Sequence, residues 1–509
     1  MKRLACILLI LTIAISWLFT FEVPHAQTNG SVTLNSNTEW TAAQNPINLN
    51  GSVTVNSNVT LTIDPGVTVN FGNYMSIIVY GTLIAQGNAN NQIVFACNGD
   101  QTLGPYTAGV SITSDQIGSS GIVNSSESII QNTVLNDVNV YVDSGMSLEV
   151  ENCVFNYASP YEPPIDIQAN SMATISNNII NYNIQNYQYG VNVIDVDANA
   201  LITDNQFEGS FGGSNNAGIA VNGGSPVILG NTFEAQYGNN SYGTKVNSGN
   251  PQISSNQFDG NGWLIGIDDL SISAFTVSNN VFSDCLSGVK DESSGPLTVQ
   301  GNQFLSGTDG IDIFPTASVT VTDNLINGNS KYGINGGGTI TSNTISNNQI
   351  GIHNPPSGII SYNNIVGNTV NSITTTVENV NAQNNWWGTT DTATINQTIY
   401  DTKVDPRLGT VLFVPFLTQP STSAPPIPSY TPAITPIPTQ IVAQEPTTTP
   451  TLLPTPTPYQ YSQTFEYQVG SLINLNLITT AVGAMLVLVW VIVILGYAAK
   501  RVISKHWVQ

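Results

Sequence analysis

A short motif built around an asparagine recurs between residues 175 and 387, and it restricts the chain to a repeating fold. Each copy has an apolar or small residue three positions before the asparagine and an apolar or aromatic residue two positions after it, as in ISSNQF at 253. The spacing of about 19 to 27 residues is the period of a solenoid. The motif asparagines are Asn178, Asn205, Asn231, Asn256, Asn280, Asn302, Asn324, Asn343, Asn363 and Asn385.

A second repeated position, a Gly followed by an apolar residue, indicates at least two short strands in each unit. The units are rich in β-branched residues, Gly and Asn, and they lack the 3.6-residue period of a helix. We therefore expect coiled parallel strands. An asparagine at a fixed corner tolerates a left-handed turn, and its amide can bind the asparagine one rung away, about 4.8 Å distant. The glycines are Gly190, Gly218, Gly243, Gly266, Gly288, Gly310, Gly333 and Gly351.

With these motifs the chain resembles the right-handed parallel β-helix proteins with pectate-lyase-like coils. The resemblance covers roughly residues 31 to 416, including an LTIDPGV segment near the start and NNWWG near the end. It implies an all-β fold, a right-handed parallel β-helix solenoid. It implies no particular activity, because this fold hosts lyases, hydrolases, epimerases, adhesins and non-catalytic surface proteins.

The two ends of the chain predict export and membrane anchoring. Residues 1–26 combine two basic residues with an apolar core, which indicates a secretory signal peptide. Residues 466–499 comprise a membrane-proximal segment and an uncharged apolar stretch that is long enough to cross a bilayer as one helix. The basic tail, residues 500–509, is then cytoplasmic by the positive-inside rule. We expect a single-pass cell-membrane protein with an extracellular solenoid.

Between these ends the sequence predicts two further parts. Residues 27–417 form the β-helix. Residues 418–465 are rich in Pro and Thr, so they cannot bury a core and are expected to form an extended, disordered stalk.

The charge balance limits the partners. Only 8% of the residues are charged and the formal net charge is −22. An acidic surface poor in Lys and Arg excludes nucleic acid as the expected partner. It also disfavours polyanionic polysaccharides, so a neutral glycan, another surface protein or no ligand is expected. The three cysteines after the signal peptide are interpreted as buried small residues, with one pair or a functional thiol as the alternative: Cys97, Cys153 and Cys285.

The residues two positions after each repeated Gly should form one outward row, because side chains alternate along a strand. One interpretation is a ladder of opposite charges. The other is a glycan-facing groove in which Asp268, Asp269 and Asp312 supply acid and base groups, assisted by Lys290 or His353. The row is Asn192, Ala220, Lys245, Asp268, Lys290, Asp312, Asn335 and His353.

The enzyme families of this fold allow a further comparison. The pectate lyases use an Arg base, whereas this solenoid has no Arg before Arg407 in its closing segment. Of the polygalacturonase motifs, only a Gly-x-Asp-Asp element is matched, at residues 266–269. No cofactor is expected. Calcium is the one possible ion, at Asp195 and Asp197, which are otherwise interpreted as solvated turn carboxylates.

Adjacent tryptophans follow the last asparagine motif. Trp386 and Trp387 form either a sugar-stacking platform or the plug that closes the hydrophobic end of the solenoid. Taken together, the sequence predicts an exported, membrane-anchored surface protein that recognises or structures extracellular glycan or another surface protein. The alternatives are a polysaccharide lyase or glycoside hydrolase that uses the Asp/Lys row, and a purely structural envelope protein.

Overall fold

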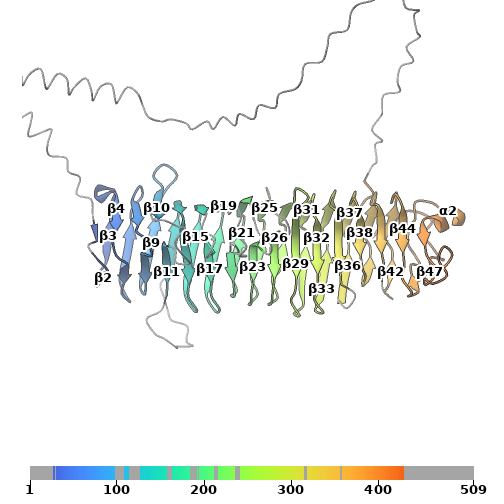
Figure 1. Cartoon of the computed structure of the whole chain (residues 1–509), viewed down its shortest axis with the longest axis horizontal. Helices are drawn as coiled ribbons and strands as arrows, with labels where there is room; N and C mark the ends of the chain where they lie inside the picture. The colour runs from blue at the N-terminus through green and yellow to red at the C-terminus, as the bar shows by residue number, and fades with distance from the viewer. Residues whose placement is uncertain are drawn as a thin grey trace, which may run out of the picture. The chain divides into compact units, whose positions relative to one another are not determined.

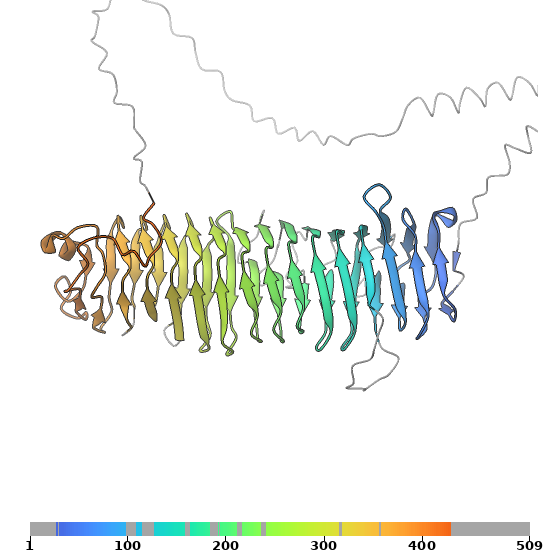
Figure 2. The ribbon, with the colours of Figure 1, turned by 180° about the vertical axis from the view of Figure 1, so that it is seen from behind.

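The computed structural model describes residues 27–28, 30–97, 108–113, 127–157, 163–183, 192, 194–210, 216–235, 241–314, 318–355 and 358–428. Their strands stack into a parallel β-helix, which confirms the predicted fold (Figures 1 and 2). Successive strands are distributed in turn among three sheets, named A, B and C here. Within each sheet a strand pairs in parallel with the equivalent strand of the next coil.

The three sheets account for nearly all the strands. Sheet A has 15 strands: β1 (Gln27–Thr28), β4 (Ile47–Leu49), β7 (Thr68–Phe71), β10 (Ile93–Cys97), β13 (Thr133–Asn136), β16 (Val154–Tyr157), β19 (Ile179–Asn183), β22 (Gln206–Ser210), β25 (Thr232–Ala235), β28 (Gln257–Asp259), β31 (Val281–Ser283), β34 (Gln303–Leu305), β37 (Leu325–Asn327), β40 (Thr344–Ser346) and β43 (Asn364–Val366). Sheet B has 16: β2 (Val32–Leu34), β5 (Val53–Val55), β8 (Ser76–Val79), β11 (Ala108–Ile112), β14 (Val138–Val142), β17 (Ile165–Ile167), β20 (Ile194–Val196), β23 (Ala217–Val221), β26 (Ser241–Val246), β29 (Leu264–Asp269), β32 (Ser287–Asp291), β35 (Asp309–Ile313), β38 (Tyr332–Asn335), β41 (Ile350–His353), β44 (Asn371–Thr374) and β46 (Ile399–Tyr400). Sheet C has 14: β3 (Thr38–Trp40), β6 (Thr60–Ile63), β9 (Thr82–Gln86), β12 (Ser128–Gln131), β15 (Ser147–Glu151), β18 (Met172–Ser176), β21 (Leu201–Thr203), β24 (Val227–Leu229), β27 (Gln252–Ser254), β30 (Phe275–Ser278), β33 (Pro296–Gln300), β36 (Ser318–Thr322), β39 (Thr339–Thr341) and β42 (Ile360–Ser361).

The core follows from the alternation of apolar and polar residues. In β6, for example, Leu61 and Ile63 are buried while Thr60 and Thr62 are partly exposed. The aromatic position of the repeated motif builds a column inside sheet A. Its rings stack with centroids 4.6–4.8 Å apart and with interplanar angles of 2–9°. The column is Phe207, Phe233, Phe258, Phe282 and Phe304.

The ten motif asparagines lie in one buried column at the corner between sheets C and A. Each Nδ2 donates to the Oδ1 of the next asparagine at 2.9–3.1 Å. The same Oδ1 accepts the backbone N–H of the preceding asparagine. The left-handed residue of the corner was expected to be the asparagine itself, and this was wrong. The residue before each asparagine adopts positive φ, between 54° and 69°, as at Asp204, Ser255 and Tyr362.

A second, shorter asparagine column stabilises the corner between sheets A and B. Asn329 donates to Asn348 at 2.8 Å, and Asn348 donates to Asn368 at 3.1 Å. The N–H of Gly307 donates to Asn329 at 3.1 Å and begins this column. Buried Cys285, one coil earlier in the same column, donates through Sγ to the carbonyl oxygen of Phe258. Cys153 and Cys285 are buried thiols that form no disulfide.

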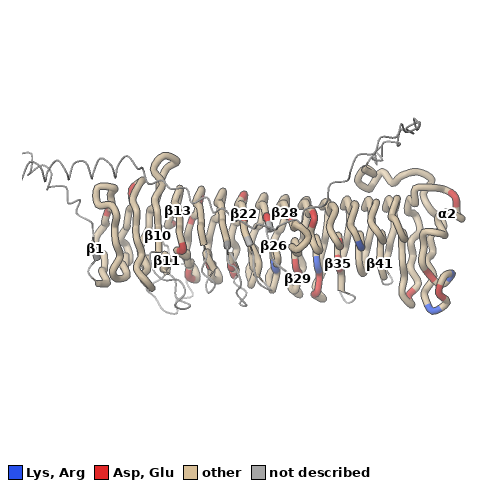
Figure 3. Tube along the Cα trace, turned by 45° about the horizontal axis from the view of Figure 1, so that its top comes forward, with Lys and Arg blue, Asp and Glu red and all other residues tan. Residues whose placement is uncertain are grey.

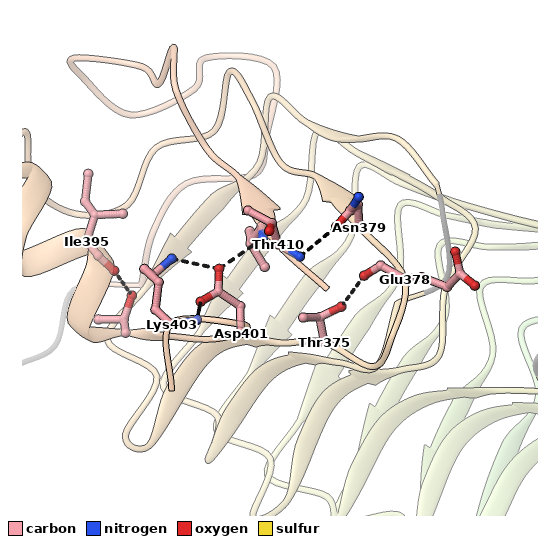
Figure 4. Close-up of polar contacts among 9 residues, drawn as sticks. Thr375, Glu378, Asn379, Ile395, Asp401, Lys403 and Thr410 are labelled. Atoms are coloured by element: carbon pink, nitrogen blue, oxygen red, sulfur yellow. Dashed lines mark hydrogen bonds and ion pairs between the residues drawn. The ribbon is translucent and has the colours of Figure 1, made fainter. Parts of the chain in front are cut away.

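The C-terminal end of the rod is closed by a short helix and a two-stranded sheet. The elements are α2 (Thr392–Gln397), β45 (Val380–Asn381) and β47 (Val411–Leu412), while a single 3-10 turn, η1 (Ala42–Gln44), lies near the other end. Asp401 is fully buried in the closing segment (Figure 4). Its carboxylate accepts the N–H and the Nζ of Lys403 and the N–H of Val411. These bonds hold the closing loop against the last coil.

The chain then turns back along the outside of sheet A. The N–H of Leu417 donates to the carbonyl oxygen of Asn385. Ser421 exchanges hydrogen bonds with Asn364, and the hydroxyl of Thr344 donates to the carbonyl oxygen of Pro425. We call residues 417–428 the strap. The stalk was expected to begin at residue 418, but the first described residues of that segment are fastened to the solenoid.

The predicted membrane segment lies outside the described residues, as do the signal peptide, the stalk beyond residue 428 and the basic tail. Among the residues that the structure does describe, no helix is long and apolar enough to cross a bilayer. Membrane anchoring therefore stays a prediction from the sequence.

Candidate functional site

The register of sheet B places most of the predicted outward row in line. Lys245, Asp268, Lys290, Asp312 and then Asn335 and His353 are consecutive partners across β26, β29, β32, β35, β38 and β41. The row was predicted to begin at Asn192, and this was wrong. Asp195 is the partner of Ala220. Asn192 lies before β20 and instead donates to Asp195 at 2.7 Å.

A second row shares this outer side, three residues earlier in each strand. Its members are Tyr242, Ile265, Ser287, Asp309, Tyr332 and Ile350. Strand alternation would place residues three apart on opposite sides of the sheet. Here the two residues between them, the repeated glycine and the residue after it, both face the core, so the two rows lie on the same side. A Cβ at Gly266 would meet the ring of Phe282, and Ile267 is fully buried in the core. We call the outer side of sheet B from β26 to β41, formed by these two rows, the charged face (Figure 3).

Asp268 is covered, although it points to the outer side. The residue is 2% exposed, and one of its carboxylate oxygens has no hydrogen-bond partner within the described part of the chain. Burial raises the pKa of Asp268 to about 6, against the opposing effect of Lys290 and Lys245 and with a further contribution from Glu292. Of the two interpretations of the row, the groove with Asp268 as an accessible acid does not fit this burial. A polysaccharide cannot reach a carboxyl group that its neighbours cover.

The opposite charges predicted for the ladder alternate in register from Lys245 to Asp312, but the close ion pairs among the described residues of this face involve other partners. Lys290 binds Glu292, which follows its own strand. Burial alone would lower the pKa of Lys290, but the hydrogen bond that it donates to Glu292 and the nearby Asp268 outweigh burial and raise the pKa. Farther along, the Nζ of Lys331 lies 3.8 Å from Asp309 on the preceding rung.

The part of the charged face on β35, β38 and β41 combines an aromatic stack with a polar pair. The rings of Tyr332 and His353 stack with centroids 4.2 Å apart and an interplanar angle of 2°. The Nζ of Lys331 lies 4.4 Å from the centre of the Tyr332 ring. Asn335 donates to Asp312 at 2.7 Å. We call these five residues the Tyr332 patch; all are at least partly exposed.

His353 is held by hydrogen bonds at both ring nitrogens. The amide of Asn354 lies 2.8 Å from Nε2, and the hydroxyl of Thr374 lies 2.7 Å from Nδ1. If the amide donates, Nε2 accepts and Nδ1 carries the proton, which is the neutral tautomer. Burial, and secondarily Lys331, lowers the pKa of His353, which favours the same form. The ring is therefore positioned for packing, and neither nitrogen is available as a base.

Asp269 faces the opposite way from the predicted groove. It is the partner of Val246 and Asp291 in a row whose other members belong to the core, and it is fully buried. Burial raises its pKa to about 7, and the nearby Asp291 adds to that effect. Asp269 is thus excluded from a site on the charged face.

The tryptophans at the end of the coils lie in different environments. Trp387 is buried, and its ring meets Phe413 edge-on at 6.1 Å. The predicted sugar platform is therefore wrong for Trp387, which closes the core. Trp386 is half-buried and its backbone bonds to Asn363 and Ile365, so a ligand role for its side chain stays a prediction.

The calcium prediction finds no support in the geometry of the described residues. Asp195 accepts hydrogen bonds from Asn192 at 2.7 Å and from Asn222 at 3.4 Å, and burial raises its pKa. Within the described part of the chain, no three His, Cys, Asp or Glu residues group closely enough to hold a metal ion.

Sequence reasoning missed the second row of the charged face and with it Tyr332, Asp309 and Lys331. The signal was present, because each member of that row immediately precedes a repeated glycine. The alternation rule hides this signal, because it assigns positions three apart to opposite faces. In the structure the glycine and the residue after it both face the core, which places the two rows on the same side.

Comparison with known proteins supports the fold. A family model described as "Right handed beta helix region" matches residues 108–267 and 264–350. No curated protein shows a significant match to the chain. Among solved structures the chain is similar to a mutant of the periplasmic alginate epimerase AlgG, at 10% identity over 77% of this chain and 82% of that chain. The TM-score of 0.20 is too low for any conclusion from that likeness. The coil pattern and the family match together identify the fold of this chain as a right-handed parallel β-helix.

Proposed function

We propose that the protein is an exported, membrane-anchored surface protein that recognises an extracellular glycan through the Tyr332 patch. The observation that supports the patch is the combination of a stacked Tyr332–His353 pair with the Asn335–Asp312 pair on the neighbouring rungs. Apolar faces of sugar rings pack on aromatic rings, and carboxylate and amide groups bind sugar hydroxyls. Regular rungs about 4.8 Å apart present these groups along one line, which suits an extended polymer.

The same geometry favours binding over catalysis. Of the three carboxylates predicted to act as acid and base, Asp268 is covered, Asp269 is buried inside the rod and Asp312 accepts a hydrogen bond from Asn335. His353 has hydrogen bonds at both nitrogens. General acid–base catalysis needs a group within reach of the substrate. A binding role needs only the exposed parts of these side chains.

The binding proposal is tested with the full-length protein on an array of neutral and acidic glycans. Wild type is expected to be retained on a subset of glycans, and Tyr332→Ala is expected to lose at least about tenfold in affinity, because an aromatic anchor is worth about 1.4 kcal/mol or more. Tyr362→Ala serves as the control, because Tyr362 is 50% exposed at another corner of the rod. If Tyr332→Ala and Tyr362→Ala were retained equally, the glycan would bind outside the Tyr332 patch. If wild type were retained on no glycan, a purely structural role would be favoured.

Membrane anchoring rests on the apolar residues 477–499 and the basic residues that follow them. Deleting residues 477–509 is expected to move the protein from the membrane fraction to the soluble fraction of its host. Continued sedimentation of the truncated chain with membranes would contradict an anchor at this end.

A further inference from the structure

Two carboxyl groups are stacked inside the rod, directly behind the charged face. Asp269 and Asp291 are register partners on β29 and β32, and neither is exposed. The neighbours on either side of them in this inward row are Val246 and Ile313, which belong to the hydrophobic core. Burying two charged carboxylates one rung apart, about 4.8 Å, is unfavourable on both desolvation and repulsion grounds.

Hydrogen bonds satisfy part of this pair. One oxygen of Asp269 accepts the N–H of Ser271 at 2.7 Å, and the other lies 3.4 Å from the hydroxyl of Ser293. Asp291 accepts the N–H of Ser293 at 2.9 Å through one oxygen. The second oxygen of Asp291 is buried and has no hydrogen-bond partner among the described residues. Burying a charged carboxylate with an unpaired oxygen is unfavourable. Protonation removes the charge and with it most of the desolvation penalty.

We propose that Asp269 and Asp291 hold one proton between them at mildly acidic to neutral pH, and that its release to solvent loosens the two coils that carry Asp268 and Lys290. The step is a simple dissociation: the carboxylic acid gives its proton to water and leaves two carboxylates in adjacent rungs. The proposal is independent of glycan binding, because it concerns the interior of the rod.

The other titratable groups near the pair support this assignment. Burial raises the pKa of both carboxyl groups, for Asp269 to about 7. The charged groups that act on Asp269 are Asp291 and, from the outer side of the same strand, Asp268; both are acidic and raise its pKa. Because the folded-state pKa lies above the unfolded value of 3.8, the stabilising effect of protonation is complete below about pH 4 and is lost as the pH rises to about 7.

The test is hydrogen exchange of the full-length protein, followed by mass spectrometry at pH 5.5 and pH 8 with correction for the intrinsic exchange rates. Protection in wild-type peptides from residues 264–295 is expected to fall on the order of tenfold to a hundredfold at the higher pH, since one pKa unit corresponds to a factor of ten. Peptides from residues 318–355 are expected to change much less, because coils of a solenoid open locally. An equal change in both regions would overturn the proposal.

The matched variants replace the two aspartates with asparagine, whose side-chain oxygen can still accept the N–H groups of Ser271 and Ser293. All variants are made in an Asp268→Asn background, because Asp268 has a pKa of about 6 and would titrate in the same peptides. In that background Asp269→Asn with Asp291→Asn is expected to abolish the pH dependence in residues 264–295, because an amide does not titrate. Asp259→Asn, on an exposed residue of the same coil, is expected to leave the pH dependence unchanged. If the double variant does not fold, infrared spectra of the Asp268→Asn protein decide: a protonated carboxyl band must be present at pH 5.5 and lost by pH 8. Absence of that band at pH 5.5 would refute a shared proton.

Discussion

At the scale of the residue, each asparagine of the long column forms several bonds at once. The amide nitrogen of Asn302 donates to the carbonyl oxygens of Val277 and Gln300 and to the side chain of Asn324. Its oxygen accepts both the N–H and the Nδ2 of Asn280. The asparagine side chain carries a carbonyl acceptor and an NH2 donor on one short group, and few other side chains do. The hydrogen bonds at this corner therefore favour asparagine.

Asn302→Ala is therefore expected to destabilise the protein by about 2 to 5 kcal/mol, because it leaves buried donors and acceptors on both neighbouring rungs unpaired. Unfolding by urea, followed by circular dichroism, measures the change. The control is Gln303→Ala, since Gln303 is the exposed next residue and is expected to change stability by less than about 0.5 kcal/mol. Similar effects of the two substitutions would show that the amide column contributes little.

The repeated motif was enough to predict this column, because the column depends only on period and residue type. The stack of phenylalanines was not predicted, although the same motif supplies its rings. The motif could not predict the local backbone. The left-handed residue is the one before each asparagine, and it is as varied as Asp204, Ser255 and Tyr362. The second amide column was missed although Asn329, Asn348 and Asn368 each follow a motif asparagine by five residues.

At the scale of the element, the closing segment depends on a single buried carboxylate. The hydrogen bonds from Lys403 and Val411 outweigh the effect of burial and lower the pKa of Asp401. Because this pKa is below the unfolded value, the contribution of Asp401 to stability is complete near neutral pH and is lost as the pH falls below the usual range of an aspartate.

Asp401→Ala is expected to lower the stability of the cap by about 2 to 4 kcal/mol at pH 7, because two backbone N–H groups lose a charged acceptor. The measurement is the hydrogen-exchange protection of residues 380–412. Asp405→Ala provides a control within the same loop, since Asp405 binds Arg407 at the surface, where solvent screens an ion pair and its contribution is small. If Asp405→Ala lowered the protection of residues 380–412 more than Asp401→Ala, the role assigned to Asp401 would be wrong.

The elements of the candidate site show where sequence periodicity stops being informative. Strand alternation identified the row from Lys245 to His353, since that row needs only the glycine positions. The row failed at Asn192, because Asp195 is the register partner of Ala220. Asp269, the neighbour of Asp268, points inward as alternation requires, so its assignment to the groove was wrong. Burial of Asp268 could not be inferred either, because it depends on neighbouring side chains rather than on strand direction.

At the scale of the whole molecule, the strap joins the last two rungs of sheet A, at Thr344 and Asn364, to the coil that follows them at Asn385. Asn364 is its central contact, because it accepts the N–H of Ser421 and donates both to that residue's carbonyl oxygen and to the Thr344 hydroxyl. Thr344 and Asn364 are almost fully buried. The strap therefore belongs to the solenoid, although its composition is that of a linker.

Asn364→Ala is expected to release the strap, with little change in the coils before it. Limited proteolysis of the full-length protein, followed by mass spectrometry, should show cleavage within residues 417–428 accelerated about tenfold, since losing about 1.4 kcal/mol of local stability raises the open population by that factor. Gln349→Ala, on an exposed side chain, should leave the cleavage rate unchanged. Unaltered cleavage in the Asn364 variant would mean that other contacts hold the strap.

The path of the strap also determines how the rod responds to mechanical load. Because residues 417–428 pass back over the rungs of Asn385, Asn364 and Thr344, tension applied to the chain beyond them acts first on the flank of the solenoid. The terminal coil is then shielded from being peeled away, and the load is shared among contacts that must slide or break before any coil can unwind. A rod fastened in this way is suited to resist shear.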